Sequence, residues 1–411
     1  MKTGSFQWMK SLNKSTILNM IRLHGPISRA EIAKITKLTP PTVTNIVNEL
    51  LDDHLVVESD LGTSTGGRKP IMLEVNNRHF SVIGIYIRER GIDVAVANLD
   101  GTINHKLELE ISEHPTKEEF LKELTNAVSL ALEKSKADEK PTLGVGIGIQ
   151  GQVNPLKGEA KWVPNLKLEN IPIKTHLESR FHIPIEVDHD VRAIALAENW
   201  FGQGRDLNNF ICVKVGTRIG AGIMLNQELY YGAHYSAGEI EHTPIDLDGP
   251  ACSCGKRGCL AAFVGAPGIV RRAKQALADG ESSTLHQSVQ KQSGADLTSK
   301  DVYTAAMEGD VLAIRLLGEA GQYLGMEITN LIHVLDPDCV ILHGGVSRAE
   351  PLQEAVHAYL LAHVSSQVSI VQTKLGKVAP VMGAFTLALK KIFDPHIDEI
   401  DHSTLRKGEQ W

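Results

Sequence analysis

Three of the chain's five cysteines fall within eight positions, in the stretch Cys252-Ser253-Cys254-Gly255-Lys256-Arg257-Gly258-Cys259, and His242 lies ten residues upstream. Thiolates and an imidazole at this density can form a tetrahedral Cys3His shell around zinc, and the two glycines permit the sharp turns of a loop around an ion. A disulfide is the alternative, but it would leave one cysteine over, and nothing else indicates an oxidising compartment. The sequence therefore predicts a structural zinc site with no open position, whose ligands are His242, Cys252, Cys254 and Cys259.

Composition indicates a protein of two to three domains, since domains of roughly 100–200 residues are typical. Hydrophobic residues make up 42% of the 411 residues and charged residues 22%, as in ordinary globular proteins. The sequence has no basic-then-apolar signal at its start and no apolar run of the roughly 20 residues that span a bilayer. We therefore expect a cytoplasmic protein with no membrane partner.

Charge is distributed unevenly along the chain. The net charge is −7, yet residues 1–80 hold ten Lys/Arg against seven Asp/Glu, a net of +3, which leaves −10 for the remainder. A small basic module attached to an acidic body indicates that the first eighty residues meet a polyanion.

Helix signals recur through the first fifty residues. Residues 13–24 have an apolar face and stop at Gly25-Pro26. Ser28 and Glu31 form a capping box at the start of a second helix, and Thr39 can cap a third helix that has Pro40 at its first position. This order predicts a helix-turn-helix whose last helix enters the major groove of DNA.

Two short strands, 55–58 and 71–75, follow and are separated by a polar, basic segment, so a winged helix-turn-helix is predicted. Small hydroxyl and amide side chains on the third helix can approach base edges, while basic residues of the wing can contact phosphates or the minor groove. A plain three-helix module, with Arg68 a solvated turn charge, is the alternative. The predicted DNA-binding residues are Thr39, Pro41, Thr42, Thr44, Asn45, Arg68 and Lys69.

The body of the chain alternates strands with helices. Strands are predicted at 81–97 (a hairpin), 143–149, 184–188, 210–215, 221–225 and 339–343, and helices at 118–136, 191–200, 267–278, 301–308 and 310–333. This alternation is typical of an α/β protein with helices on both faces of its sheets.

Several motifs of the body occur together in an order that resembles the ROK family (repressors, open reading frames and sugar kinases). They are Gly146-Ile147-Gly148-Ile149-Gln150-Gly151, Pro164-Asn165-Leu166, His189-Asp190, Gly216–Gly222, Gly238-Glu239-Ile240-Glu241-His242 and the cysteine loop. The resemblance implies an actin-like ATPase (sugar-kinase-like) fold of two α/β lobes with a sugar site in the cleft. It also implies the regulator branch, as in xylose and N-acetylglucosamine repressors, where a winged helix precedes the body. The implied domains are 1–78 (winged helix-turn-helix), 79–393 (two-lobed body) and 394–411 (tail).

Kinases of this family use two glycine-rich phosphate loops, and both are altered in this chain. In the first, Gly84–Arg90, Tyr86 replaces the aspartate that serves the metal-bound nucleotide, and the charged residues Arg88 and Glu89 replace both glycines. In the second, Gly216–Gly220, Arg218 stands where the kinases have glycine. The resemblance therefore implies a protein that has lost ATP binding and is not an enzyme.

The sugar-binding positions match the family pattern more closely than the two phosphate loops do. The resemblance assigns effector contacts to Asn165, His189, Asp190, Glu239 and His242, with Asp190 matching the kinase general base and His242 keeping one N–H for a sugar oxygen. Asp190 as a helix cap and Asn165 as a turn residue remain alternatives. Two departures from the family, Glu241 for glycine and Ala261 for a sugar-binding glutamate, favour a weak sugar site or a phosphosugar effector.

These features together predict a homodimeric (or dimer-of-dimers) repressor of carbohydrate catabolism genes, xylose metabolism among them. Its partners would be double-stranded operator DNA and a sugar or sugar phosphate. Two alternatives remain open at this point: an ATP-dependent sugar kinase with a DNA-binding arm, and a regulator controlled by a protein partner.

Overall fold

The computed structural model describes residues 6–61, 69–286, 297–365 and 368–393. The chain divides into two compact units. The first comprises Met1–Asp190 with Val381–Trp411, and the second comprises Val191–Pro380. The predicted residue Arg68 and the predicted tail 394–411 lie outside the described residues.

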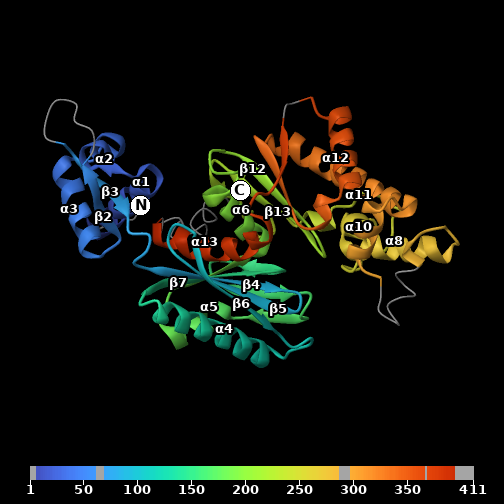
Figure 1. Cartoon of the computed structure of the whole chain (residues 1–411), viewed down its shortest axis with the longest axis horizontal. Coiled ribbons are helices and arrows are strands. Elements are labelled where there is room, and N and C mark those ends of the chain that lie inside the picture. Colours follow the sequence, from blue (N-terminus) through green and yellow to red (C-terminus); the bar gives the residue numbers. More distant parts are fainter. Residues whose placement is uncertain (1–5, 62–68, 287–296, 366–367, 394–411) are drawn as a thin grey trace, which may run out of the picture. The chain divides into compact units, whose positions relative to one another are not determined.

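The first unit begins with a winged helix-turn-helix, drawn in blue in Figure 1. Its elements are α1 (Phe6–His24), β1 (Ile27–Ser28), α2 (Arg29–Thr36), α3 (Pro40–Asp52), β2 (Val56–Leu61) and β3 (Ile71–Val75), and the sheet order is β1-β3-β2. Ser28 and Glu31 form the predicted capping box, and the Thr39 side chain accepts from the N–H of Thr42 at the start of α3. The first helix starts at Phe6, earlier than the residue 13 that the apolar pattern indicated.

A small apolar core holds these helices together. The buried residues recur every three to four positions along α1 and α3, so each helix presents one apolar stripe to the others. The fully buried members of this core are Ile17, Ile21, Ile32, Val43, Val47, Leu50 and Leu73. The opposite side of α3 is thereby left exposed.

The first α/β sheet follows in the same unit. It has the order β11-β7-β4-β5-β6, in which β7 pairs parallel with both of its neighbours. Figure 1 shows α4 and α5 on one face of this sheet and α13 on the other. The bounds are β4 (Ser81–Arg88), β5 (Gly91–Ala97), β6 (Ile103–Glu110), α4 (Lys117–Ala137), β7 (Thr142–Ile149), α5 (Ile173–Phe181), β11 (Ile185–His189) and α13 (Ala379–Phe393). Between β7 and α5 lies a small antiparallel sheet of β8 (Gln152–Asn154), β9 (Glu159–Val163) and β10 (Leu168–Ile171).

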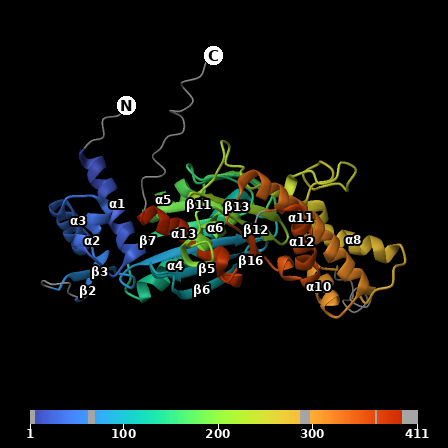
Figure 2. The same ribbon diagram turned by 90° about the horizontal axis from the view of Figure 1, so that it is seen from above.

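The second unit is built around a sheet of order β14-β13-β12-β15-β16. Val191 and Ala195 of α6 approach Gly222 on one face of it, whereas the large apolar core lies on the other face, under α7, α8, α11 and α12. Figure 2 shows α8, α10, α11 and α12 grouped together. The bounds are α6 (Asp190–Phe201), β12 (Phe210–Val215), β13 (Ile219–Leu225), β14 (Glu228–Leu229), α7 (Ala261–Val264), α8 (Ala266–Ala278), α10 (Ser299–Met307), α11 (Val311–Leu335), β15 (Cys339–His343), α12 (Glu350–His363) and β16 (Ser369–Gln372).

The two α/β sheets have the same strand order. If the strands of each are numbered along the chain, both read third-second-first-fourth-fifth, with the first three antiparallel and the fourth and fifth parallel to the first. This repetition confirms the predicted α/β class and its two-lobed body.

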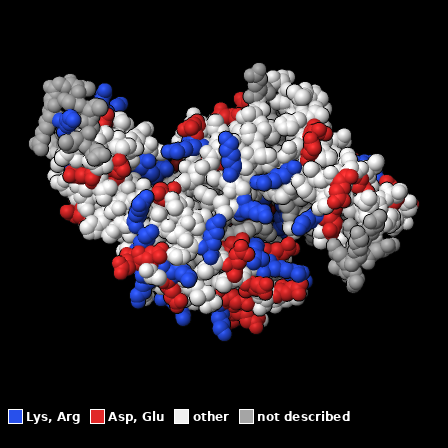
Figure 3. Space-filling model, viewed as in Figure 1, with Lys and Arg blue, Asp and Glu red and all other residues white. Residues whose placement is uncertain are grey.

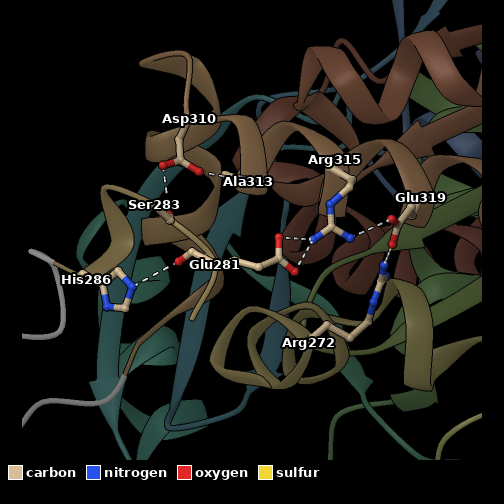
Figure 4. A network of polar contacts seen from close by, with 8 residues as sticks. All are labelled: Arg272, Glu281, Ser283, His286, Asp310, Ala313, Arg315 and Glu319. Carbon is tan, nitrogen blue, oxygen red and sulfur yellow. Dashed lines mark hydrogen bonds and ion pairs between the residues drawn. The ribbon is translucent and has the colours of Figure 1, made fainter. Parts of the chain in front are cut away.

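A chain of polar contacts joins the helices of the second unit (Figure 4). Arg315 of α11 donates to Glu281, 2.7 Å from its Oε2, and to Glu319, and Glu319 also accepts from Arg272 of α8. Asp310 caps α11 by accepting from the N–H of Ala313. These contacts fasten α8 and the segment after it to α11.

Surface charge in the first unit is mixed in sign. On the face shown in Figure 3, acidic and basic side chains are interspersed over β6 and α4. β6 alternates between half-buried and exposed residues, and the exposed ones include Lys106, Glu108 and Glu110. No helix among the described residues is long and apolar enough to cross a bilayer.

Candidate functional site

The four predicted metal ligands lie together. The ligand atoms of His242, Cys252, Cys254 and Cys259 are all within 4.8 Å of one another. Cys254 Sγ is 3.7 Å from Cys259 Sγ, and Cys252 Sγ is 3.8 Å from His242 Nδ1. Zn–S bonds of about 2.3 Å in a tetrahedron place two sulfurs about 3.8 Å apart, so the cluster has the dimensions of such a site. The arrangement can hold a metal ion through Nδ1 and three sulfurs.

The cysteine loop owes its shape to short backbone bridges. Pro244 pairs with Cys259 and Ala251 with Arg257, which brings the two ends of the loop back to each other. Gly258 has φ +67°, and a Cβ there would lie 1.6 Å from the carbonyl oxygen of Asp246. Only glycine therefore fits beside Cys259. Burial raises the pKa of the Cys259 thiol to about 12, so a bound cation would be needed to keep it as a thiolate at neutral pH.

Helices α8 and α11 fasten this loop from outside. Arg271 donates to the carbonyl oxygens of Ala251 and Ala262, at 3.2 and 2.9 Å. The hydroxyl of Thr243, next to His242, donates to Glu327 of α11 at 3.1 Å. Burial raises the pKa of Glu327. Residues on both sides of the ligands are thus tied to rigid helices.

Arg218 and Glu241, two of the three departures from the kinase pattern in this unit, contact each other. Arg218, in the turn between β12 and β13, donates a hydrogen bond to Oε1 of Glu241, and the N–H of Ile219 lies 3.4 Å from Oε2. Oε1 of Glu241 also lies 3.4 Å from Nε2 of His242. The N–H of His242 that is predicted to bind a sugar oxygen therefore faces the carboxylate of Glu241.

The first altered phosphate loop is also closed by an internal ion pair. β4 and β5 are joined by the tight turn Glu89-Arg90, and Nε of Arg88 donates to Asp93 Oδ1 at 2.8 Å. The Arg88 guanidinium lies against Gly91, where a Cβ would be 2.5 Å from its carbon. A charged side chain thus covers the backbone of this turn.

Three predicted effector residues lie in the first unit. His189 ends β11 and Asp190 begins α6, with Nδ1 of His189 3.5 Å from Oδ1 of Asp190. The Asp190 carboxylate is 2% exposed and sits in the first turn of α6, where the helix dipole favours negative charge. Asn165 lies in the turn between β9 and β10, and both polar atoms of its amide are buried without a hydrogen-bond partner among the residues that the structure describes.

Glu239 lies in the second unit, immediately before the 3-10 turn Ile240–His242. It is half-buried, and its carboxylate has no hydrogen bond or ion pair to any residue that the structure describes. Ala261 begins α7, directly after the buried Leu260, so its methyl group offers no polar contact at that position.

Of the predicted DNA-binding residues that the structure describes, those from Thr39 to Asn45 lie on α3 or at its N-cap, and Lys69 lies two positions before β3. Thr39, Pro41, Thr44, Asn45 and Lys69 are exposed, and Thr42 is half-buried. The hydroxyls of Thr39 and Thr42 lie 2.8 Å apart, and that of Thr44 donates to the carbonyl of Pro40 at 2.9 Å. The amides of Asn45 and Asn48 have no partner among the described residues, so they are the side chains on α3 most available to base edges.

Sequence reasoning missed two parts of the site. Arg271 lies in a predicted helix, but no local pattern shows that it donates to the carbonyl of Ala251 beside the cysteine loop. Glu241 stands beside a ligand, yet its pairing with Arg218 depends on a turn 23 positions away.

Comparisons with known proteins agree with this geometry. The ROK family model matches residues 82–391, and a winged helix-turn-helix DNA-binding model matches residues 12–57. A putative xylose repressor from Caldicellulosiruptor sp. (strain Rt8B.4) is 31% identical over 391 residues, which are 94% of this chain and 97% of that protein. The N-acetylglucosamine repressor of Escherichia coli O157:H7 is 27% identical over 95% of each chain.

Solved structures of both a regulator and a kinase are similar to the model. A ROK family transcriptional regulator, a homologue of the E. coli MLC protein, matches with a TM-score of 0.84 at 25% identity over 94% of this chain and 97% of that one. A ROK family glucokinase from Streptomyces griseus, in complex with glucose and AMPPNP, matches with a TM-score of 0.65 at 27% identity over 75% of this chain and 98% of that one. These matches confirm the sugar-kinase-like fold of the body.

Proposed function

The chain belongs to the ROK family, and we propose that it is a DNA-binding transcriptional repressor of carbohydrate catabolism genes controlled by a sugar or sugar phosphate. The observation that carries the proposal is the presence of an exposed recognition helix and a ROK body on one chain, with full-length similarity to xylose and N-acetylglucosamine repressors. Xylose and N-acetylglucosamine are therefore the first effectors to test.

DNA binding would use α3 in the major groove. Asn45 is suited to a bidentate contact with adenine, and Thr39, Pro41, Thr42 and Thr44 surround it. Lys69, and Arg68 beside it in the sequence, would neutralise phosphates next to the wing. A homodimer would place two such helices in major grooves one helical turn or a multiple of it apart.

Effector binding would involve Asn165, His189, Asp190 and Glu239. The strongest support is the unpaired Asn165 amide, because a buried polar group without a partner costs about 1–3 kcal/mol that a hydrogen-bonding ligand removes. The free carboxylate of Glu239 is the matching acceptor for sugar hydroxyls. The effector would regulate DNA binding only through unequal affinity for two states of the protein.

The cysteine cluster would hold a structural zinc ion. The donor set of three thiolates and one imidazole is one that zinc prefers, and the S···S and S···N separations fit a tetrahedron. Zinc would neutralise most of the thiolate charge and would fix the segment that carries Glu239 and His242.

Loss of nucleotide binding is supported by the two closed turns. Arg88 pairs with Asp93 in the first and Arg218 with Glu241 in the second, so each turn carries a charged, ion-paired side chain where the kinases have glycine and the triphosphate. Tyr86 replaces the carboxylate that would serve the metal-bound nucleotide.

A combined binding experiment tests the repressor proposal. Duplexes selected from a random pool by the full-length protein would be used in mobility-shift titrations with and without each member of a sugar and phosphosugar panel. A shift that one sugar reverses, together with a thermal stabilisation by the same sugar, is the expected result. DNA binding that responds to none of the panel would favour control by a protein partner, and absence of any selected sequence would reject the proposal.

A sugar kinase with a DNA-binding arm is the second candidate, because the S. griseus glucokinase structure covers 75% of this chain. Incubation with ATP, magnesium and a hexose panel should give no ADP above the no-sugar background. Sugar-dependent ADP formation would establish the kinase.

A further inference from the structure

One unassigned side chain, Glu241, stands between the metal cluster and the Arg218 turn. It belongs to the 3-10 turn that also supplies His242, and its side chain is 11% exposed. Its Oε1 accepts a hydrogen bond from the Arg218 guanidinium and lies 3.4 Å from His242 Nε2. Its Oε2 lies 3.4 Å from the backbone nitrogen of Ile219. A nearly buried carboxylate is thus directed at the imidazole of a predicted ligand.

The two ring nitrogens of His242 face different neighbours. Nδ1 lies 3.8 Å from Cys252 Sγ and therefore points toward the cluster, whereas Nε2 points toward Glu241. A histidine that binds metal through one nitrogen carries a proton on the other, and a carboxylate that accepts this proton fixes the ring and makes the free nitrogen a better ligand.

We propose that Glu241 is a positioning residue for the metal centre, and that Arg218 holds it in place, so that Arg218, Glu241 and His242 form a relay from the turn between β12 and β13 to the zinc ion.

Charge explains why Arg218 and Glu241 occur together. Three thiolates and one Zn²⁺ carry a net charge of −1, so a bare carboxylate next to them would be repelled. The Arg218 guanidinium offsets the charge of Glu241 from the other side. Glycine at position 241 would leave Nε2 without an acceptor from this side, and glycine at position 218 would leave the carboxylate uncompensated.

The relay has a consequence for the turn itself. The N–H of Gly216 is bonded to the carbonyl of Arg218, and the N–H of Ala266 to the carbonyl of Gly216, so the turn is joined to the start of α8 as well. Zinc binding at His242 would then stabilise the closed turn, and opening the turn would loosen His242. This inference rests on the zinc assignment proposed above but requires neither DNA nor sugar.

Zinc affinity of the full-length protein tests the relay. Each variant would be loaded with zinc and titrated with a chromogenic chelator. Glu241→Ala should weaken zinc binding about 10–100-fold, as loss of the carboxylate partner of a ligating histidine does. Glu241→Gln should weaken it less, since its amide oxygen can still accept from Nε2, and Arg218→Met should lie between Glu241→Ala and the parent. Glu281→Ala is the matched control: it removes a carboxylate paired with Arg315 in the same unit, and zinc affinity should not change.

The absorption spectrum of the cobalt-substituted protein gives a second test. It would stay unchanged if Glu241 contributed only to the stability of the fold. The ligand-field bands of the Co²⁺-loaded protein should shift in Glu241→Ala and not in Glu281→Ala, because only the first change alters the imidazole. Zinc affinity within twofold of the parent and an unchanged cobalt spectrum in Glu241→Ala would overturn the relay. If that variant does not fold, parent-like values in both Glu241→Gln and Arg218→Met overturn it. A parent protein that binds no zinc contradicts the zinc assignment, and a protein that binds zinc but no DNA contradicts the repressor proposal alone.

Discussion

Gly146 in the middle of β7 lies directly against the carbonyl group of Ala384 in α13. A Cβ built at Gly146 would be 1.8 Å from that oxygen and 2.8 Å from the carbonyl carbon. Gly84 of β4 meets the same helix, with its Cβ position 2.4 Å from the carbonyl oxygen of Val381. The glycines of these central strands thus let a helix backbone approach the sheet more closely than any side chain would allow.

Gly146→Ala should therefore destabilise the protein. Backbone atoms cannot move aside as a flexible side chain can, so we expect a loss of about 1–3 kcal/mol in the free energy of unfolding, the usual cost of overpacking. Urea denaturation followed by circular dichroism measures it. Gly318→Ala is the control, because no described atom other than the adjacent backbone of α11 lies within 4 Å of its Cβ position, and it should be neutral or stabilising by up to about 1 kcal/mol. Equal effects of the two substitutions would contradict the close approach.

Asp310→Asn should reduce stability at neutral pH and not in acid. Burial alone raises the pKa of Asp310, but hydrogen bonds from the N–H groups of Ala313 and Thr284 and from the Ser283 hydroxyl outweigh it and hold the pKa below its ordinary value of 3.8 (Figure 4). A lowered folded pKa means that the carboxylate stabilises the protein above pH 3.8 and that this contribution disappears as the pH falls through the folded pKa.

The expected difference between parent and Asp310→Asn is about 1 kcal/mol at pH 7, because Asn can still cap α11 but its neutral amide oxygen accepts weaker hydrogen bonds from Ser283 and Thr284 than the carboxylate does. Thermal denaturation between pH 7 and pH 3 should show the difference shrinking. Asp336→Asn, at the other end of α11 in an exposed left-handed position, should show no such loss at any pH. A pH-independent difference for Asp310→Asn would rule out the carboxylate as its source.

Asn165→Leu should abolish effector binding without lowering stability. Leucine has a similar volume and removes two buried polar atoms that lack partners, so the free energy of unfolding should stay level or rise. The thermal shift given by the effector should disappear. Asn154→Leu is the contrasting variant: its side-chain oxygen accepts from the N–H of Lys157, so this change should lower stability and keep the shift. An effector shift that survives in Asn165→Leu would remove Asn165 from the site.

Lys69→Ala should weaken DNA binding almost equally for all sequences. Loss of one phosphate contact reduces the slope of the logarithm of the DNA association constant against the logarithm of the salt concentration by about 0.9. Mobility shifts at several salt concentrations measure the slope. Lys161→Ala, an exposed lysine of β9 with no ion pair among the described residues, should leave the slope unchanged. A sequence-dependent effect of Lys69→Ala would instead indicate base contact.

Cys259→Ser should remove zinc and impair DNA binding together with the effector response. Cys259 is the most buried ligand, and the loop around it is held by the bridge to Pro244. Metal analysis of the purified protein and mobility shifts would be compared with Ser253→Ala, an exposed substitution in the same loop that should change neither. Normal DNA binding in a zinc-free Cys259→Ser protein would separate the metal from DNA recognition.

The sequence alone determined the features that depend on neighbouring residues. The Ser28–Glu31 capping box, the Thr39 cap and the cysteine loop are set by side chains within a few positions of one another, and all three are present in the structure. Alternation of strands and helices likewise gave the α/β class, and the motifs gave the family. The domain boundaries at 78 and 393, the oligomeric state and the identity of the effector stay predictions.

The tertiary structure decided the contacts between residues far apart in the chain. In the sequence, Arg218 and Glu241 are two separate departures from family motifs, and only the folded chain shows that they pair with each other. In the same way, the glycines of β7 are explained by the close approach of α13, which lies more than two hundred positions later in the chain. Local propensity carries no information on such pairs, because their energy comes from sheet register and helix packing that exist only after the chain has folded.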